Sequence, residues 1–115
     1  MTEPSQPVPP VRILVAEDEE GMRDLVGRVL EDEGYEVIAV VDGREAVAWL
    51  DGGEFDLVLS DVRMPGLDGM AVLHRAMELR LDQPVILMTA FGTIASAVEA
   101  MRAGAYHYLA KPFDL

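Results

Sequence analysis

The chain has 115 residues, half of them hydrophobic and 26% charged, which suits one globular domain with a single modest core. Its formal net charge of −12 disfavours direct binding to nucleic acid, and its lack of cysteine excludes disulfides and thiolate sites. It shows neither an apolar run long enough to cross a bilayer nor a secretory signal, so we expect no membrane association and a cytoplasmic location.

The first half of the chain alternates between apolar strands and amphipathic helices. Residues 1–10 hold four of the seven prolines and predict a flexible leader, with the domain proper over 11–115. Strands are predicted at 11–16 and 36–40. Between them a helix is predicted, ending near Gly34, with apolar residues at helical spacing: Met22, Leu25, Val26, Val29 and Leu30.

The alternation continues through the middle of the chain. Asp42 can cap a helix that ends at Gly52 and Gly53 and carries Ala46, Val47 and Leu50. A third strand at 57–60 runs straight into Asp61. Asp68 can then cap a helix that has four apolar residues on one face: Met70, Leu73, Ala76 and Met77.

The last third adds strands at 85–88 and 106–110, with a helix between them that Thr93 can cap and Gly104 can end. Because five strands alternate with helices and read as apolar runs, we expect a parallel sheet covered on both faces, with right-handed crossovers. The pattern also calls for a fifth helix, although the chain stops at Leu115. We therefore expect a domain cut before or within that helix, with exposed apolar surface and some self-association.

Several groups capable of chemistry follow the predicted strands. Glu17 and Asp18 follow the first strand, Asp61 the third, Thr89 the fourth, and Lys111, the single lysine, the fifth. The carboxyl ends of parallel strands meet at one edge of a sheet, where active sites of such folds form. Taken singly, each residue has a plainer reading as a helix cap, a turn residue, a strand former or a solvated charge. Their joint placement on one edge outweighs those readings.

Three carboxylates brought together repel one another unless a cation or a proton neutralises them. Magnesium prefers oxygen ligands, so Asp18 and Asp61 can bind it directly and Glu17 can reach it through water. A backbone carbonyl such as that of Arg63 can add another oxygen. An aspartate carboxylate can attack phosphorus to give an aspartyl phosphate, with Lys111 and Thr89 contacting the phosphoryl oxygens.

At this point the sequence resembles a known family, the receiver domains of bacterial two-component response regulators. The matching segments are VRILVAEDE (11–19), DVRMPGLDG (61–69), MTA (88–90) and KPF (111–113), in the order of the family and over nearly the whole chain after the leader. The stretch from Thr89 to Phe113 resembles receivers of NtrC-type transcription activators. The resemblance implies a flavodoxin-like (CheY-like) fold with strand order 2-1-3-4-5.

The resemblance also implies roles for single residues. Asp61 falls at the phosphoacceptor position, Lys111 at the phosphate-binding lysine, Thr89 at the switch hydroxyl and Tyr108 at the aromatic switch position. The metal positions fall on Glu17, Asp18, Asp61 and the backbone carbonyl of Arg63, for Mg2+ or Mn2+. Pro112 falls where the family has a peptide bond that is typically cis. Glutamate at the first acidic position and the missing last helix depart from the family pattern.

The partners implied are a histidine kinase or phosphotransfer protein, an output domain or downstream protein, and a second copy in a homodimer. The implied chemistry is self-phosphorylation from a phosphodonor and slow self-dephosphorylation, without other enzymatic activity. On phosphorylation, Thr89 would move toward the phosphoryl group and the Tyr108 ring would turn into the space that it leaves.

Other functions remain open at this stage. A flavin-binding domain would place phosphate against the acidic 17–19 segment, which repels it. An aspartate-dependent phosphatase usually has a second aspartate two residues after its nucleophile, where this chain has Arg63. A receiver-like domain used only for protein contacts would not need the full set of acids, Thr89 and Lys111. A P-loop is excluded, because the single lysine precedes Pro112.

Overall fold

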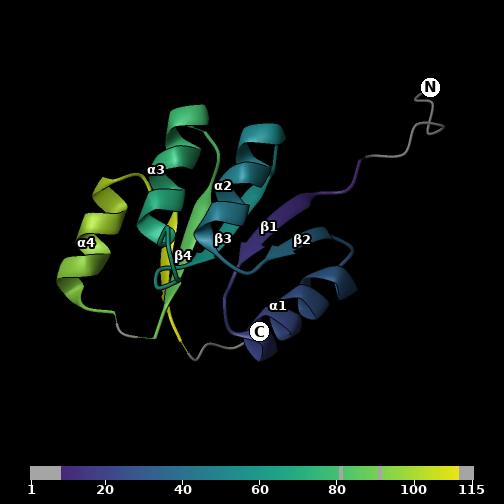
Figure 1. The fold of residues 1–115 in the computed structure, drawn as a ribbon, viewed down its shortest axis with the longest axis horizontal. Helices are drawn as coiled ribbons and strands as arrows, with labels where there is room; N and C mark the ends of the chain where they lie inside the picture. Colours follow the sequence, from purple (N-terminus) through teal and green to yellow (C-terminus); the bar gives the residue numbers. More distant parts are fainter. Residues whose placement is uncertain (1–8, 81, 91, 112–115) are drawn as a thin grey trace, which may run out of the picture.

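The computed structural model describes residues 9–80, 82–90 and 92–111. Strands and helices alternate along this part of the chain (Figure 1), as the sequence pattern predicts. In chain order they are β1 (Arg12–Ala16), α1 (Glu20–Asp32), β2 (Glu36–Val40), α2 (Gly43–Gly52), β3 (Leu57–Asp61), α3 (Gly69–Leu79), β4 (Val85–Thr89), α4 (Ile94–Arg102) and β5 (His107–Ala110).

The strands form one parallel sheet in the order β2-β1-β3-β4-β5, which confirms the expected topology. The register pairs Ala16 with Ser60, and Asp61 with Met88. All five strands run in the same direction, toward the lower side of Figure 1, so their carboxyl ends share one edge of the sheet. The residues that follow β1, β3, β4 and β5 therefore meet there.

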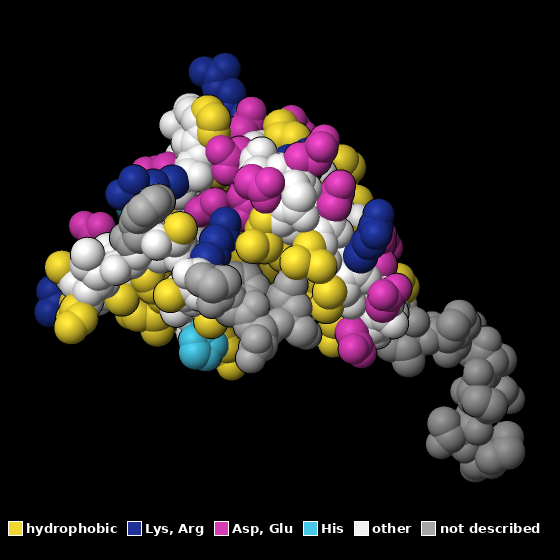
Figure 2. All heavy atoms as spheres, turned by 90° about the horizontal axis from the view of Figure 1, so that it is seen from below, with side chains coloured by type: hydrophobic (Ala, Val, Ile, Leu, Met, Phe, Trp, Pro, Cys, Tyr) yellow, Lys and Arg dark blue, Asp and Glu magenta, His cyan; other side chains and the backbone are white. Residues whose placement is uncertain are grey.

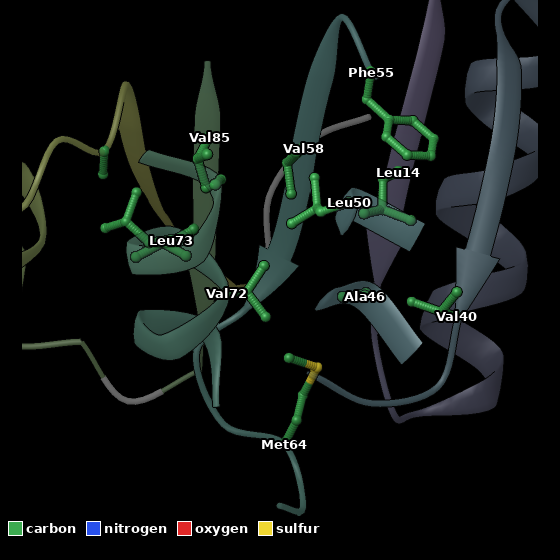
Figure 3. Packing of buried hydrophobic residues seen from close by; sticks show 14 of the residues in the cluster. Leu14, Val40, Ala46, Leu50, Phe55, Val58, Met64, Val72, Leu73 and Val85 are labelled. Atoms are coloured by element: carbon green, nitrogen blue, oxygen red, sulfur yellow. The ribbon is translucent and has the colours of Figure 1, made fainter. Parts of the chain in front are cut away.

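Apolar side chains cover both faces of the sheet. On one face the strands pack against α2, α3 and α4 through a large cluster that includes Leu14, Val58, Leu73 and Leu87 (Figure 3). On the other face α1 packs through a smaller cluster centred on Val15 and Val26. Central strands buried on both sides read as unbroken apolar runs, which explains why β1 and β3 lack polar alternation.

Helix caps follow the sequence closely. Asp42, Asp68 and Thr93 are the N-caps of α2, α3 and α4, and each accepts a hydrogen bond from a backbone N–H of the first turn. Gly34 and Gly104 follow α1 and α4 with φ of 94° and 110°, a left-handed conformation that favours glycine. These short-range interactions fix where most of the helices begin and end.

The observed strand bounds differ from the predicted ones by single residues. β3 and β4 extend to Asp61 and Thr89, because the ladder continues through Asp61–Met88 and Thr89–Ala110 pairs. β5 begins at His107 rather than at Tyr106, whose exposed ring packs edge-on against the His107 ring. Because β3 and β4 are longer than predicted, Asp61 and Thr89 are part of the sheet, and the ladder hydrogen bonds hold their backbone.

Some expectations concern residues outside the described ranges. Most of the 1–10 leader, the peptide bond at Pro112 and the start of the expected fifth helix belong to this group. Within the described residues, no helix combines the length and apolar character needed to span a membrane.

Candidate functional site

Three carboxylates converge at the carboxyl edge of the sheet. Glu17 and Asp18 directly follow β1, and Asp61 is the last residue of the neighbouring strand β3. One carboxylate oxygen from each of the three lies within 4.8 Å of the others. Figure 2 looks onto this edge and shows acidic side chains gathered over part of it. The adjacency of β1 and β3, which no local sequence signal shows, is what unites these residues.

Lys111 connects two of these carboxylates. Its Nζ donates a hydrogen bond to Oδ2 of Asp61 at 2.9 Å and another to Oε1 of Glu17. Its backbone N–H donates to the carbonyl of Thr89 at 2.7 Å, which fixes the end of β5 beside β4. Burial by itself would lower the pKa of Lys111, but its bonds to Glu17 and Asp61 outweigh burial and raise that pKa. The ammonium therefore stays charged at any physiological pH.

The Glu17 side chain is fully buried, and both of its oxygens have partners. Oε1 accepts from Lys111, and Oε2 accepts from the backbone N–H of Glu19 at 3.1 Å. Burial raises the pKa of Glu17, and the nearby charge of Asp61 adds to this, while Lys111 and the Glu19 N–H act in the opposite direction. Glu17 is thus a carboxylate held in one orientation, with a pKa above that of an ordinary glutamate.

Asp18 and Arg63 lie on the solvent-exposed side of the site. Asp18 is exposed, and its carboxylate has no hydrogen-bond donor within the described ranges, so it is open to a ligand from solvent. The backbone N–H of Arg63 donates to Oδ1 of Asp61 at 3.2 Å and orients that carboxylate. A metal-binding role for the Arg63 carbonyl stays a prediction.

Thr89 lies on β4, the strand next to that of Asp61, and Tyr108 lies on β5, on the far side of β4. Thr89 is buried at the end of β4, and Tyr108 is half-buried in β5. Both side chains flank Gly92, because a Cβ at that position would lie 3.0 Å from the Thr89 methyl group and 3.1 Å from the Tyr108 ring. The hydroxyl of Tyr108 is 2.9 Å from Oγ of Ser96 on α4. The two predicted switch residues are therefore neighbours, with their roles still to be tested.

Two further residues support the site and were absent from the sequence-based prediction. Arg23, in the first turns of α1, donates from Nη1 to the carbonyl of Glu17 at 2.9 Å and to that of Asp18 at 3.4 Å. Glu19 caps α1 by accepting from the N–H groups of Gly21 and Met22. The only sequence signal for the contact of Arg23 with the acidic loop is its position, one turn inside a helix that follows two acidic residues. It was indistinguishable from a solvated charge.

The donor set fits a hard divalent cation. Three carboxylates and one ammonium leave a formal charge of −3 + 1 = −2, which a dication balances. All of the donors are oxygen, as magnesium and calcium prefer. Chemically, the arrangement places an oriented aspartate oxygen between a cation-binding cluster and a fixed ammonium, which are the parts needed to stabilise a transferring phosphoryl group.

The sequence matches the response regulator receiver domain pattern over residues 13–115. Among curated relatives, the transcriptional regulatory protein TcrA of Mycobacterium tuberculosis is 47% identical over 105 residues, which is 91% of this chain and 42% of TcrA. The regulatory protein AtoC of Escherichia coli, a relative of the NtrC type, is 39% identical over 90% of this chain and 23% of its own length. The chain thus spans less than half of these relatives.

Solved structures agree with the sequence relatives. A CheY-like receiver domain from Methanospirillum hungatei superposes with a TM-score of 0.88 at 31% identity, over 92% of this chain and 85% of that one. A response regulator from Burkholderia pseudomallei, solved with a phosphorylated aspartic acid, a calcium ion and citrate, gives 0.84 at 29% identity over 90% and 61%. With its fold, its strand order and the match over residues 13–115, the chain belongs to the receiver domain family of two-component response regulators.

Proposed function

We propose that Asp61 is the phosphoacceptor of this receiver domain and that it takes its phosphoryl group from a histidine kinase or a phosphotransfer protein. The observation that carries this proposal is the position of Asp61. Its Oδ2 is bound to the Lys111 ammonium at 2.9 Å, and its carboxylate shares the acidic cluster with Glu17 and Asp18. The phosphorylated aspartic acid in the related B. pseudomallei structure supports the same chemistry.

Glu17, Asp18 and Asp61 would hold Mg2+, or Mn2+ in its place, with the Arg63 carbonyl as a further ligand. When bound, the cation spreads the negative charge of the phosphoryl group and of the attacking carboxylate. Asp18 is the carboxylate most open to solvent, so it would contact an incoming cation first. Glu17 gives charge from a fixed position behind it. The calcium ion in the B. pseudomallei protein supports a divalent-cation site in relatives.

In the transfer step, an oxygen of Asp61 forms a bond to phosphorus while the bond from phosphorus to the donor nitrogen breaks and its electron pair stays on that nitrogen. Lys111 is already bonded to Asp61, so it can contact a phosphoryl oxygen without a large movement. Arg63 holds the other carboxylate oxygen through its backbone N–H. The same residues would support self-phosphorylation from a small phosphodonor and slow self-dephosphorylation.

Thr89 and Tyr108 would convert this modification into a change of shape. Thr89 moves its hydroxyl toward the new phosphoryl oxygens, and the Tyr108 ring turns into the volume that Thr89 leaves. Both side chains lie close to Gly92, where an added Cβ would meet each of them, and this proximity supports the coupling. Phosphoryl contacts shift the population only by their preference for one of the two forms.

The partners that we propose follow from the family. They are a kinase or phosphotransfer protein, an output domain or downstream protein that regulates transcription, and a second copy of the chain. TcrA is a transcriptional regulatory protein and AtoC is a regulatory protein, which supports a regulatory output of that kind. A cytoplasmic location stays a prediction from the sequence.

The central test is the Asp61→Asn variant. After treatment with acetyl phosphate and a magnesium salt, we expect the unmodified sequence to gain one phosphoryl group that peptide mapping by mass spectrometry assigns to Asp61. We expect the variant to gain none, because an amide is not a nucleophile toward phosphorus at neutral pH. Asp56→Asn is a matched control, since Asp56 is exposed and lies before β3. Undiminished labelling of Asp61→Asn would falsify the assignment.

A metal-dependent phosphatase with an aspartate nucleophile is the second candidate, because it forms the same type of intermediate. It is disfavoured because Arg63 stands where such enzymes place their acid, and its backbone N–H is bonded to Asp61. Many turnovers on a small phosphate ester would favour the phosphatase, whereas slow labelling of a single residue favours the receiver.

A further inference from the structure

The amino-terminal end of α4 is closed by a compact set of hydrogen bonds. The backbone N–H of Ser96 donates to Oγ1 of Thr93 at 3.0 Å, and the backbone N–H of Thr93 donates to Oγ of Ser96 at 3.0 Å. These two bonds form a capping box, which satisfies N–H groups that have no partner inside the helix. The Ser96 hydroxyl also donates to the carbonyl of Thr93 at 3.0 Å. Ser96 is therefore fixed in one orientation.

Tyr108 reaches into this capping box from β5. Its hydroxyl is 2.9 Å from Oγ of Ser96. The Ser96 hydroxyl also lies 3.1 Å from Oγ1 of Thr93, and in its bond to Tyr108 either hydroxyl can be the donor. Oγ of Ser96 thus has both the Thr93 N–H and the Tyr108 hydroxyl as hydrogen-bond partners. The bond links β5, which leads directly into Lys111, to the first turn of α4.

The ring of Tyr108 is held from a second side by Gly92. A Cβ there would lie 3.1 Å from a ring carbon of Tyr108 and 3.0 Å from the Thr89 methyl group, which is closer than most such contacts. Any side chain at 92 would therefore push against both residues. The ring sits between a fixed hydroxyl at its tip and a tightly packed backbone at its edge.

We propose that Ser96 is the positioning residue that holds the Tyr108 ring against α4 in the unphosphorylated domain. This inference rests on the proposed function, because it names the residue that opposes the switch. One net hydrogen bond changes a two-state ratio by about fivefold. Loss of the Tyr108–Ser96 bond should move the population by about that factor toward the form in which the ring has turned away from α4.

The experiment uses the whole chain and two independent measurements. Without any phosphodonor, NMR contacts between the Tyr108 ring and the Gly92 and Ser96 protons report the position of the ring. With acetyl phosphate and magnesium, the initial rate of Asp61 labelling reports access to the active form. We expect Ser96→Ala to weaken the ring contacts and to raise the labelling rate by about two- to fivefold. Ser96→Thr, which keeps the hydroxyl, should restore both.

Three comparisons distinguish a Ser96 that holds the Tyr108 ring from a Ser96 that only caps α4. Tyr108→Phe should match Ser96→Ala in rate, and the double variant should add nothing to either single one, because both remove the same bond. Thr93→Val removes the cap hydroxyl and its two contacts with Ser96, but it keeps both hydroxyls of the Tyr108–Ser96 bond, so the labelling rate should stay near that of the unmodified sequence. Additive effects of the Tyr108 and Ser96 changes, or an equal rate increase in Thr93→Val, would overturn the proposal.

The proposal and the proposed function fail in different ways. If Asp61 of the unmodified sequence takes no phosphoryl group, the proposed function is wrong, while the NMR contacts still decide whether Ser96 holds the ring. If Asp61 is labelled but Ser96→Ala leaves both the ring contacts and the rate unchanged, only the role of Ser96 is wrong.

Discussion

Lys111 is the only lysine in the chain, and its ammonium is shared between Glu17 and Asp61. A phosphoryl group on Asp61 brings oxygens of its own to this cation. Lys111 can exchange its bond to Glu17 for one to the phosphoryl group while it stays beside Asp61. The longer glutamate side chain at position 17 is what reaches the ammonium, so the departure from aspartate gives the lysine a fixed starting position.

We expect Lys111→Ala to slow labelling of Asp61 by about 10- to 100-fold, the range for loss of a hydrogen bond to a charged group. Magnesium affinity should be unchanged or higher, because the variant removes a positive charge from beside the carboxylates. Labelling kinetics and a magnesium titration by calorimetry measure the two effects. Arg75→Ala is a suitable control, since Arg75 pairs with Asp51 and Glu78 on the surface. Equal labelling rates with and without Lys111 would remove its assigned role.

The raised pKa of Glu17 predicts how metal binding depends on pH. An ordinary glutamate has a pKa near 4.5, whereas burial raises the pKa of Glu17 above that value. Protons compete with the cation for the carboxylate, so magnesium affinity should fall as the pH drops, starting above the usual glutamate range. Titrations between pH 4 and 7 test this. Glu17→Gln should bind magnesium more weakly and lose the upper part of the pH dependence.

At the scale of elements, the start of α3 is packed directly against the end of β3. A Cβ at Gly69 would meet the carbonyl of Asp61 and would lie 2.7 Å from Cα of Val62. The Gly69 N–H also donates to the carbonyl of Val62 at 2.8 Å. A glycine is required here because two backbones touch, and the backbone in question carries the proposed phosphoacceptor.

Gly69→Ala should therefore lower the free energy of unfolding by about 1–3 kcal/mol or more and should also impair Asp61 labelling. Gly27→Ala is the matched control. Gly27 lies inside α1, a Cβ there meets nothing within 4 Å, and alanine favours helix by about 0.5–1 kcal/mol over glycine. Urea unfolding followed by circular dichroism should show opposite signs for the two variants. A neutral effect of Gly69→Ala would mean that α3 can shift away from β3.

The sequence predicted the elements well where their signals are local. Asp42, Asp68 and Thr93 were identified as caps because capping involves residues two or three apart. The bonds of Arg23 to the acidic loop and of Tyr108 to Ser96 were not predicted. The first looks like a surface charge on a helix, and the second joins residues that are 12 positions apart on different elements. Neither leaves a periodic trace in the sequence.

For the whole molecule, the alternation of elements predicted a parallel sheet, but the strand order came only from the family resemblance. Periodicity shows which residues are buried and does not show which strands are neighbours. The convergence of Glu17, Asp18 and Asp61 depends on the pairing of β1 with β3, so the candidate site followed from topology rather than from composition. The acidic total charge alone gave no hint of where the acids gather.

One side of the molecule presents apolar surface. Ile94, Val98 and Met101 of α4 are exposed, Ile94 by 85%, and with Ala97 and Arg102 they line a shallow hollow of about 440 Å³. We expect the chain to self-associate at high concentration through this face. In sedimentation experiments, Ile94→Asp should shift the equilibrium toward monomer, while Leu25→Asp on the distant α1 should not. A monomeric unmodified chain at millimolar concentration would contradict the expectation.

Two side-chain contacts arise within a few residues of each other, one from β5 and one from the residue that follows it. Tyr108 bonds to Ser96 on the surface helix, and Lys111, three positions later, bonds to Asp61. Successive side chains of a strand point to opposite faces, so an inserted or deleted residue between the two would turn one of them to the wrong side. In such a chain the Tyr108–Ser96 contact and the Lys111–Asp61 contact could not form together, so phosphorylation of Asp61 would no longer be coupled to α4. The number of residues between Tyr108 and Lys111 therefore matters more than their identity.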